Sequence, residues 1–247
     1  MKNWGASLMK IDCKDKKYDI LNREVAALQG SIILDNCCGQ RFIAAGASNK
    51  SLTINGVPGN ALGAYLDGAE IIVRGNAQDA TGDTMNDGRI IINGSCGDAV
   101  GYAMRGGKIF VRGDVGYRAG IHMKSYEEKV PVIIIGGKCG SFLGEYQAGG
   151  IIIALGLGYD DGDVLDSFCA TGMHGGKIFI RTDELHAKIT PQICVRTATD
   201  DDIAQIAPFI KEFCQCFGIP EAEVYSKNFK VLTPNSSNPY KQLYVQN

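Results

Sequence analysis

The sequence predicts an all-β fold, a right-handed parallel β-helix of about seven coils, because one short pattern repeats along most of the chain. A short apolar run precedes each repeat point, as at residues 71–73, 90–92 and 109–111. One strand per unit cannot enclose a core, so each unit must stack on the next as a solenoid. The repeat points are glycines 19 residues apart, with one insertion, at Gly56, Gly75, Gly94, Gly113, and then Gly137 and Gly156.

Aligned repeats place the same kinds of side chain in the same columns. Successive side chains of an extended chain point to opposite faces, so alternate columns face the interior. We expect one inward column of mostly Leu and Met, and a second of small or apolar residues. The first contains Leu66, Met85, Met104, Met123, Gln147 and Met173, and the second contains Pro58, Ala77, Cys96, Val115 and Cys139. The columns beside them are mixed in character and are expected to face outward.

Three segments are predicted along the chain. Residues 1–30 form an entry segment with a short helix at residues 22–28, and Gly30 is expected to stop it. Residues 31–186 form the β-helix, with the first strand at residues 32–34. Residues 187–247 form a helix and an extended tail. Thr199 and the three aspartates after it indicate the helix start, and Gly218 indicates its end.

Two details of the C-terminal segment stay open at this point. Pro208 lies inside the predicted helix and either kinks it or begins a new one. Residues 234–247 are rich in Asn, Ser and Pro, yet they include Tyr240 and Tyr244, which suit a tail that packs against a surface.

Composition argues against several classes of protein. The net charge is −2, which gives no electrostatic footprint for nucleic acid or an anionic membrane. No apolar run is long enough to span a bilayer, and the first residues lack the apolar core of a secretion signal. Nine cysteines at irregular spacing then indicate reduced thiols and a cytoplasmic protein.

A search for catalytic and ligand-binding motifs finds no convincing site. The Gly-Lys pairs at residues 107–108 and 176–177 lack the first glycine and the Ser/Thr of a phosphate-binding loop. No Cys-x-x-Cys occurs, and the acidic cluster Asp160, Asp161, Asp163 and Asp166 lacks calcium-loop spacing, so a solvated loop is favoured. His122 and His174 fall in outward columns as surface residues. We therefore assign no catalytic, cofactor-binding or metal-binding residue in this chain.

Several longer strings resemble the GXGXG domain of glutamate synthase. Two of them are GVPGNALG at residues 56–63 and DVGYRAGIHMK at residues 114–124. The resemblance is close over residues 20–186 and looser beyond, and the same domain resembles one component of formylmethanofuran dehydrogenase. The other strings lie at residues 21–24, 39–43, 75–79, 101–107 and 142–150.

The resemblance implies a right-handed parallel β-helix that carries no catalytic residue of its own. In the large glutamate synthase chain this domain packs beside glutaminase and flavin domains. The present chain lacks those parts: residue 2 is Lys2 where the glutaminase needs a cysteine nucleophile, and no flavin barrel is present. It is most similar to the stand-alone form, whose partners are separate chains.

The predicted function is therefore a non-catalytic subunit of a split glutamate synthase, an oxidoreductase of glutamate biosynthesis. It would position glutaminase-like and FMN-dependent subunits so that ammonia passes between them. FMN and an iron–sulfur cluster are expected in those partners and no cofactor in this chain. The candidate interface residues are polar or aromatic positions that the solenoid alone does not require: Gln40, Arg41, Asn76, Gln78, Asp79, Tyr117 and Arg118.

Three alternatives remain open from the sequence. In the first, the polar groups at those positions form hydrogen bonds with the backbone of the turns instead of contacting a partner. In the second, the chain is a component of a formylmethanofuran dehydrogenase-type oxidoreductase. In the third, it is a free-standing homo-oligomer that binds a metabolite or regulates nitrogen metabolism, with its terminal segments capping the β-helix.

Overall fold

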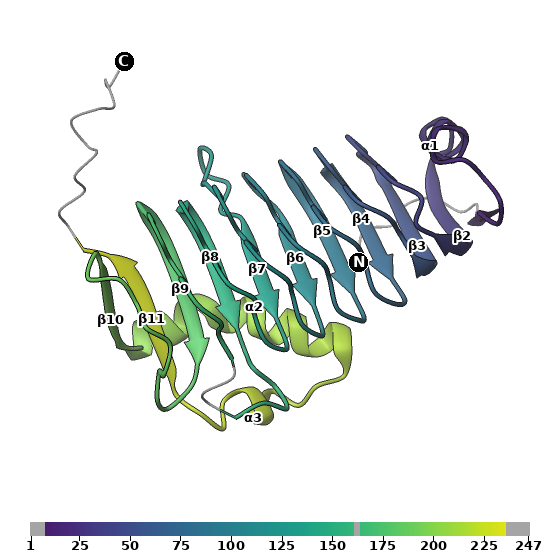
Figure 1. Cartoon of the computed structure of the whole chain (residues 1–247). Helices are drawn as coiled ribbons and strands as arrows, with labels where there is room; N and C mark the ends of the chain where they lie inside the picture. The colour runs from purple at the N-terminus through teal and green to yellow at the C-terminus, as the bar shows by residue number, and fades with distance from the viewer. Residues whose placement is uncertain (1–7, 161–163, 236–247) are drawn as a thin grey trace, which may run out of the picture.

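The computed structural model describes residues 8–160 and 164–235, and within them one eleven-stranded sheet runs the length of the molecule (Figure 1). Its strand order is β1 to β9 in sequence, followed by β11 and then β10. The parallel strands are β1 (Leu8–Asp12), β2 (Gly30–Cys38), β3 (Lys50–Val57), β4 (Asp67–Val73), β5 (Asp87–Ile92), β6 (Lys108–Val111), β7 (Val132–Ile135), β8 (Ala148–Ala154) and β9 (Gly175–Arg181).

The strand register shows one coil per sequence repeat. Ile71 pairs with Ile90, and Ile90 pairs with Ile109, each a step of 19 residues. The step from Ile109 to Ile133 is 24 residues, and the extra chain forms the tight turn at Tyr126 and Lys129. The predicted parallel β-helix is confirmed.

Both predicted inward columns lie in the core. Leu66, Met85, Met104 and Met123 have no exposed surface, and every member of the second column is buried. Gln147 replaces methionine in the first column and is also fully buried. Its Nε2 donates to the carbonyl oxygens of Gly149 and Gly150, both at 3.1 Å, so part of its polarity is satisfied inside the coil.

The return arc of each coil contains three residues with left-handed φ at alternate positions. In the second coil these are Ala61, Gly63 and Tyr65, with φ of 62°, 63° and 57°. The middle position faces the core: a Cβ on Gly82, its counterpart in the next coil, would lie 2.4 Å from Ile109 Cδ1. The two flanking positions of the arc carry side chains in most coils even though left-handed φ favours glycine.

The N-terminal segment adds a strand and a longer helix than the sequence indicated. β1 pairs in parallel with β2, so the sheet begins before the predicted first strand. α1 (Tyr18–Ala27) starts four residues early and ends before Gly30, which begins β2 instead. The buried Lys50 caps its C-terminus: Nζ donates to the carbonyl oxygens of Leu28 at 2.7 Å and Val25 at 2.9 Å. Lysine at this position matches the negative end of the helix dipole.

The C-terminal segment contains α2 (Asp200–Phe217), as predicted, and more strand than predicted. Thr199 and Asp202 form a capping box, Gly218 ends the helix with a φ of 66°, and Pro208 lies inside it without ending it. The structure adds two strands that the sequence did not predict: β10 (Ile193–Thr197) and β11 (Phe229–Pro234) pair antiparallel and extend the sheet beyond β9. α3 (Glu221–Val224) connects α2 to β11, and residues 236–247 lie outside the described residues.

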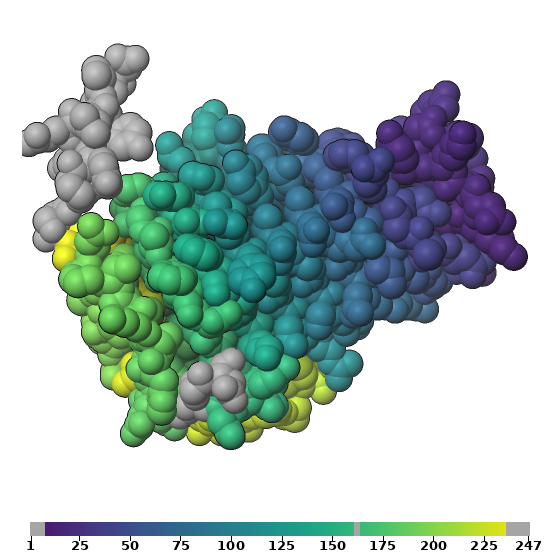
Figure 2. Space-filling model, viewed as in Figure 1, coloured from purple at the N-terminus to yellow at the C-terminus, as the bar shows by residue number. Residues whose placement is uncertain are grey.

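α2 covers the outer face of the sheet (Figure 1). Its Ile206, Ile210 and Phe213 share a buried cluster with Phe110 and Ile134 of the strands. Both faces of these strands are therefore buried, which explains their unbroken apolar runs. The space-filling view shows a body that is broad at this C-terminal half and narrows toward the N-terminal end (Figure 2).

Asp202 joins the start of α2 to the sheet. Its carboxylate is almost fully buried and pairs with Arg196 of β10 and, at 3.0 Å, with Lys177 of β9. It also accepts from the Thr199 N–H at 3.0 Å. The Arg196 guanidinium, helped by these other donors, holds the pKa of Asp202 well below its usual range despite the opposing effect of burial.

Candidate functional site

The predicted interface residues fall into three places on the β-helix, beginning with the first coil. Gln40 is buried there, unlike the outward orientation that the sequence suggested. Its Nε2 donates to Cys13 O at 2.9 Å and its Oε1 accepts from Cys38 N at 2.7 Å, so it ties the segment after β1 to the first coil. Arg41 is exposed, with its guanidinium 5.0 Å from the Tyr18 ring centroid.

The second group lies where strands turn into return arcs, and its polar side chains bond the next coil. Asn76 Oδ1 accepts from Ser95 N at 2.9 Å, and Asp79 Oδ1 accepts from Asp98 N at 2.9 Å. The same ladder continues when Asp98 Oδ1 accepts from Tyr117 N at 2.8 Å. These carboxyl and amide groups satisfy turn backbone, as the first of the alternatives predicted.

The side chains of Gln78 and Tyr117 have no such role. Both are exposed, Tyr117 by 52%, and neither side chain makes a hydrogen bond to another of the described residues. The second group is therefore mixed: Asn76 and Asp79 hold coils together, while Gln78 and Tyr117 present their side chains to solvent.

Arg118 belongs to a cluster of outward-facing side chains that we call the aromatic ridge, defined as Arg118, His122, Phe142, Tyr146 and Phe168, of which Phe142 is half-buried and the others are exposed. Phe142 and Phe168 stack with centroids 4.9 Å apart and planes 16° apart. The Arg118 guanidinium lies 4.9 Å from the Phe142 centroid, and its Nε donates to Glu145 Oε2 at 2.9 Å. His122 stacks on Tyr146 at 5.2 Å with planes 12° apart. These separations are close to the spacing of adjacent strands, so successive coils place rings at stacking distance.

Every member of the aromatic ridge has left-handed φ, between 52° and 64°. They occupy the two flanking positions of the return arcs, where a side chain projects outward. At the first flanking position the three preceding coils instead carry Ala61, Ala80 and Ala99, and the first coil carries Phe42. Phe42 and Tyr65 are also exposed at flanking positions, in the first two coils, but the run of neighbouring large side chains that defines the aromatic ridge lies on the coils that follow Ala99.

The cysteines are separate thiols, and burial raises the pKa of several. Burial raises the pKa of Cys96 to about 11 and that of Cys169 to about 12. Such thiols stay protonated at neutral pH and behave as small core residues. Among the described residues no cluster of three His, Cys, Asp or Glu side chains suits a metal ion. Asp161 and Asp163 of the predicted acidic loop lie outside those residues.

One known family model matches nearly the whole of this chain. The profile of the GXGXG motif family covers residues 9–238. The chain belongs to the GXGXG motif family. An uncharacterized protein of Methanocaldococcus jannaschii is 45% identical over 255 aligned residues, covering 98% of both chains.

A solved structure shares the fold of this GXGXG chain. It is a chain of the formyltransferase/hydrolase complex of Methylorubrum extorquens, determined with methylofuran. It superposes with a TM-score of 0.61 at 17% identity and covers 92% of this chain and 91% of the other. At that identity the likeness shows the fold. None of the helices that the structure describes is long and apolar enough to cross a membrane.

Sequence reasoning found Arg118 and missed the rest of the aromatic ridge. It treated the outward columns as mixed, without regard to which residues take left-handed φ. The signal was present in the sequence: Arg118, Phe142 and Phe168 all lie two residues before the middle position of an arc. Aligned as a column, they would have indicated a patch on neighbouring coils.

Proposed function

We propose that this protein is a scaffold subunit of a split glutamate synthase and that the aromatic ridge is its main contact with a partner chain. The β-helix would hold a glutaminase-like subunit and an FMN-dependent subunit in fixed positions, so that ammonia passes from one to the other without escaping. FMN and the iron–sulfur cluster would belong to the partners. Sequence strings such as those at residues 56–63 and 114–124 support this assignment over other multi-subunit enzymes.

The aromatic ridge is the observation that carries the proposal. Phe168 is 57% exposed and Tyr146 is 44% exposed, although aromatic side chains usually bury much of their surface. Aromatic and Arg side chains dominate the binding energy of protein interfaces, where truncating one of them costs about 2 kcal/mol or more. The ring stacks and the Arg118–Glu145 pair fix these side chains before binding, which lowers the entropy lost on association.

A second candidate comes from the fold comparison. The related chain belongs to a formyltransferase/hydrolase complex, and the likeness extends over 92% of the present chain. In this case the protein would be a component of a formylmethanofuran dehydrogenase-type assembly. The aromatic ridge would serve the same purpose, and only the partner chains would differ.

The experiment is co-purification of the tagged full-length protein from its own host, with mass spectrometry and an absorbance scan of the eluate. Glutaminase-like and flavin-containing chains, with flavin absorbance, are the expected result. Recovery of formyltransferase-like or hydrolase-like chains would replace the proposal with the second candidate. A colourless homo-oligomer without partners would reject both and favour the free-standing module.

A further inference from the structure

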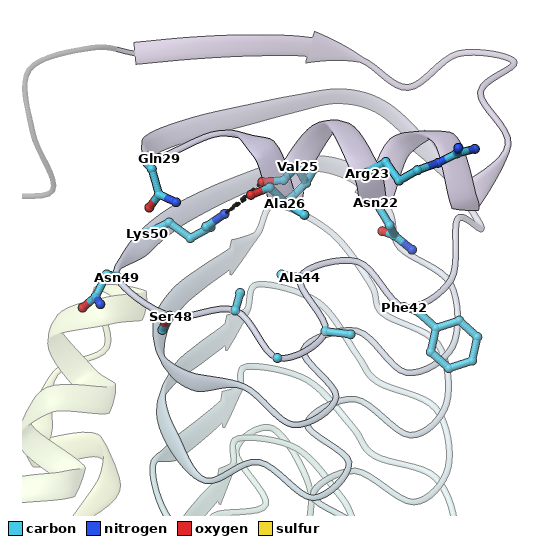
Figure 3. Close-up of a pocket in the computed structure, with 13 residues that line it drawn as sticks. Asn22, Arg23, Val25, Ala26, Gln29, Phe42, Ala44, Ser48, Asn49 and Lys50 are labelled. Atoms are coloured by element: carbon cyan, nitrogen blue, oxygen red, sulfur yellow. Dashed lines mark hydrogen bonds between the residues drawn. The ribbon is translucent and has the colours of Figure 1, made fainter.

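A cleft of about 620 Å³ lies at the N-terminal end of the β-helix, between α1 and the first return arc (Figure 3). Its volume is within the range of small-molecule pockets. Alanines and Val25 form much of its wall, and Arg23 and Lys50 are its charged residues. No Asp or Glu is among the described residues that line it, so the cleft favours an anionic group.

The hydrogen bonds between successive coils identify the backbone groups that have no preceding coil to bond at the floor of this cleft. In the second coil, the N–H groups of Gly63 and Asp67 donate back to the first coil, at 2.8 and 2.9 Å. The carbonyl oxygen of Ala64 accepts from the first coil at 2.7 Å. The same three contacts recur from coil to coil, for example at Gly82, Asn86 and Asp83.

The first coil has no return arc before it. By the 19-residue repeat, the groups that point backward from it are the N–H of Ala44, the carbonyl of Ala45 and the N–H of Ser48. All three residues line the cleft. Within residues 8–160 and 164–235, none of these three backbone groups makes a hydrogen bond. They form a donor, acceptor, donor series that an inner coil would otherwise satisfy.

α1 replaces only part of the missing coil. Asn22 Nδ2 donates to the Arg41 carbonyl at 2.9 Å, a position that an N–H group of the preceding coil takes elsewhere in the stack. Asn22 Oδ1 is buried and has no hydrogen-bond partner within the part of the chain that the structure describes. In Figure 3 the Asn22 side chain extends from α1 toward the cleft. Asn22 therefore adds a second unpaired acceptor to the residues that line the cleft.

Charge and backbone geometry define the ligand. The N–H groups of Phe42 and Gly46 donate to the second coil, at 2.9 and 2.7 Å, which leaves those of Ala44 and Ser48 as the backbone donors on the side of the cleft, where they suit an anion. The Arg23 side chain is 76% exposed and pairs with Asp19 at 2.9 Å, and in Figure 3 it extends along α1 away from Ala44 and Ser48, so its charge acts from the rim of the cleft. The acceptors call for an N–H donor on the same molecule.

From these features we infer that the cleft is a binding site for a small ligand of the amino-acid class. Its carboxylate would accept from the Ala44 and Ser48 N–H groups and be attracted by the positive charge of Arg23 at the rim. Its ammonium or amide N–H would donate to the Ala45 carbonyl, near Asn22. This goes beyond the proposed scaffold role and does not depend on it, because the aromatic ridge takes no part in the site.

The test uses the full-length protein and a panel of the standard amino acids and simple dipeptides at millimolar concentration, followed by backbone amide NMR. The expected result is a saturable shift of the Ala44 and Ser48 amide signals with at least one member of the panel. Hydrogen exchange at these two amides should slow when that member is bound, whereas Gly63 and Asp67 should be protected in its absence.

Two matched substitutions on α1 separate the site from general effects. Ala26 and Ala27 are both exposed, and only Ala26 lines the cleft. Ala26→Phe should weaken binding by about tenfold or more, while Ala27→Phe should leave it within about twofold. Arg23→Gln should weaken carboxylate ligands selectively. No shift with any panel member, or equal effects of the two alanine substitutions, would overturn the inference.

Discussion

Close stacking of coils predicts that two neighbouring glycines differ sharply in their tolerance of alanine. Gly68 and Gly88 each follow an aspartate in adjacent coils and have nearly the same φ, 100° and 104°. A Cβ on Gly68 would meet nothing within 4 Å. A Cβ on Gly88 would lie 2.3 Å from the carbonyl oxygen of Ala69 in the preceding coil. Comparing alanine substitutions at the two glycines therefore separates the effect of strain in φ from the effect of contact between coils.

The difference in stability follows from that contact. Both substitutions carry the same backbone strain, of order 1–3 kcal/mol, which cancels in the comparison. Only Gly88→Ala must also move β4 and β5 apart, by about 1 Å to restore an ordinary contact, since 3.4 Å is where such contacts begin. Overpacking of this kind costs about 1–3 kcal/mol, and each weakened ladder hydrogen bond adds about 1 kcal/mol. We expect Gly88→Ala to be less stable than Gly68→Ala by roughly 2–4 kcal/mol.

Thermal and urea unfolding of both variants measure this difference. For a domain of this size, 2–4 kcal/mol corresponds to a lower Tm for Gly88→Ala by roughly 4–16 °C. Hydrogen exchange should also increase at β4 and β5 in Gly88→Ala alone. Equal loss of stability in the two variants would refute the argument that backbone contact between coils, rather than φ, makes Gly88 necessary.

Three further predictions concern the ends and turns of the stack. Lys50→Met should release the C-terminus of α1 and cost about 2–3 kcal/mol, because it leaves carbonyl groups unpaired, and faster hydrogen exchange over α1 measures it. The pKa of Asp202 is lower in the folded protein than its value near 3.8 in the unfolded chain, so the ionised carboxylate stabilises the fold fully above pH 3.8. This stabilisation is lost as the pH falls below 3.8. Asp202→Asn should therefore lower the free energy of unfolding at neutral pH and make that free energy depend less on pH in acid. Asp79→Ala should cost about 1 kcal/mol in urea unfolding by removing the acceptor for Asp98 N, and Asp79→Asn should keep most of it; equal losses would contradict the ladder.

Much of the fold follows from periodic residues. Glycine spacing and the inward columns of Leu66, Met85 and Cys96 predict the coils, because each position has one environment in every repeat. Thr199 and Gly218 mark the ends of α2 through local capping, which sequence shows directly.

The parts that were missed depend on contacts between distant segments. β1 and β10 are short and mostly exposed, so their sequences carry little pattern, and their pairing partners decide their structure. The orientation of Gln40 depends on Cys13, 27 residues earlier. The apolar runs of β5 to β9 did contain a signal: strands buried on both faces imply a cover, and α2 supplies it.

The candidate site was only partly accessible to sequence reasoning for a similar reason. Asn76 and Asp79 are polar at outward positions, and nothing in one repeat shows that they bond the next. The aromatic ridge arises when Arg118, Phe142 and Phe168 become neighbours across coils. The insertions change the sequence step there, so the alignment of these columns is less evident than in the regular coils.

Binding of a partner protein by the aromatic ridge can be tested by comparing a double variant of the ridge with a control. Tagged wild type, the double variant Tyr146→Ser with Phe168→Ser, and a control, Tyr225→Ser just after α3, are purified from the host and their bound chains quantified. We expect the double variant to keep the wild-type Tm but to lose most of its partners, while the control retains them. Full recovery of the partners by a folded double variant would contradict the claim.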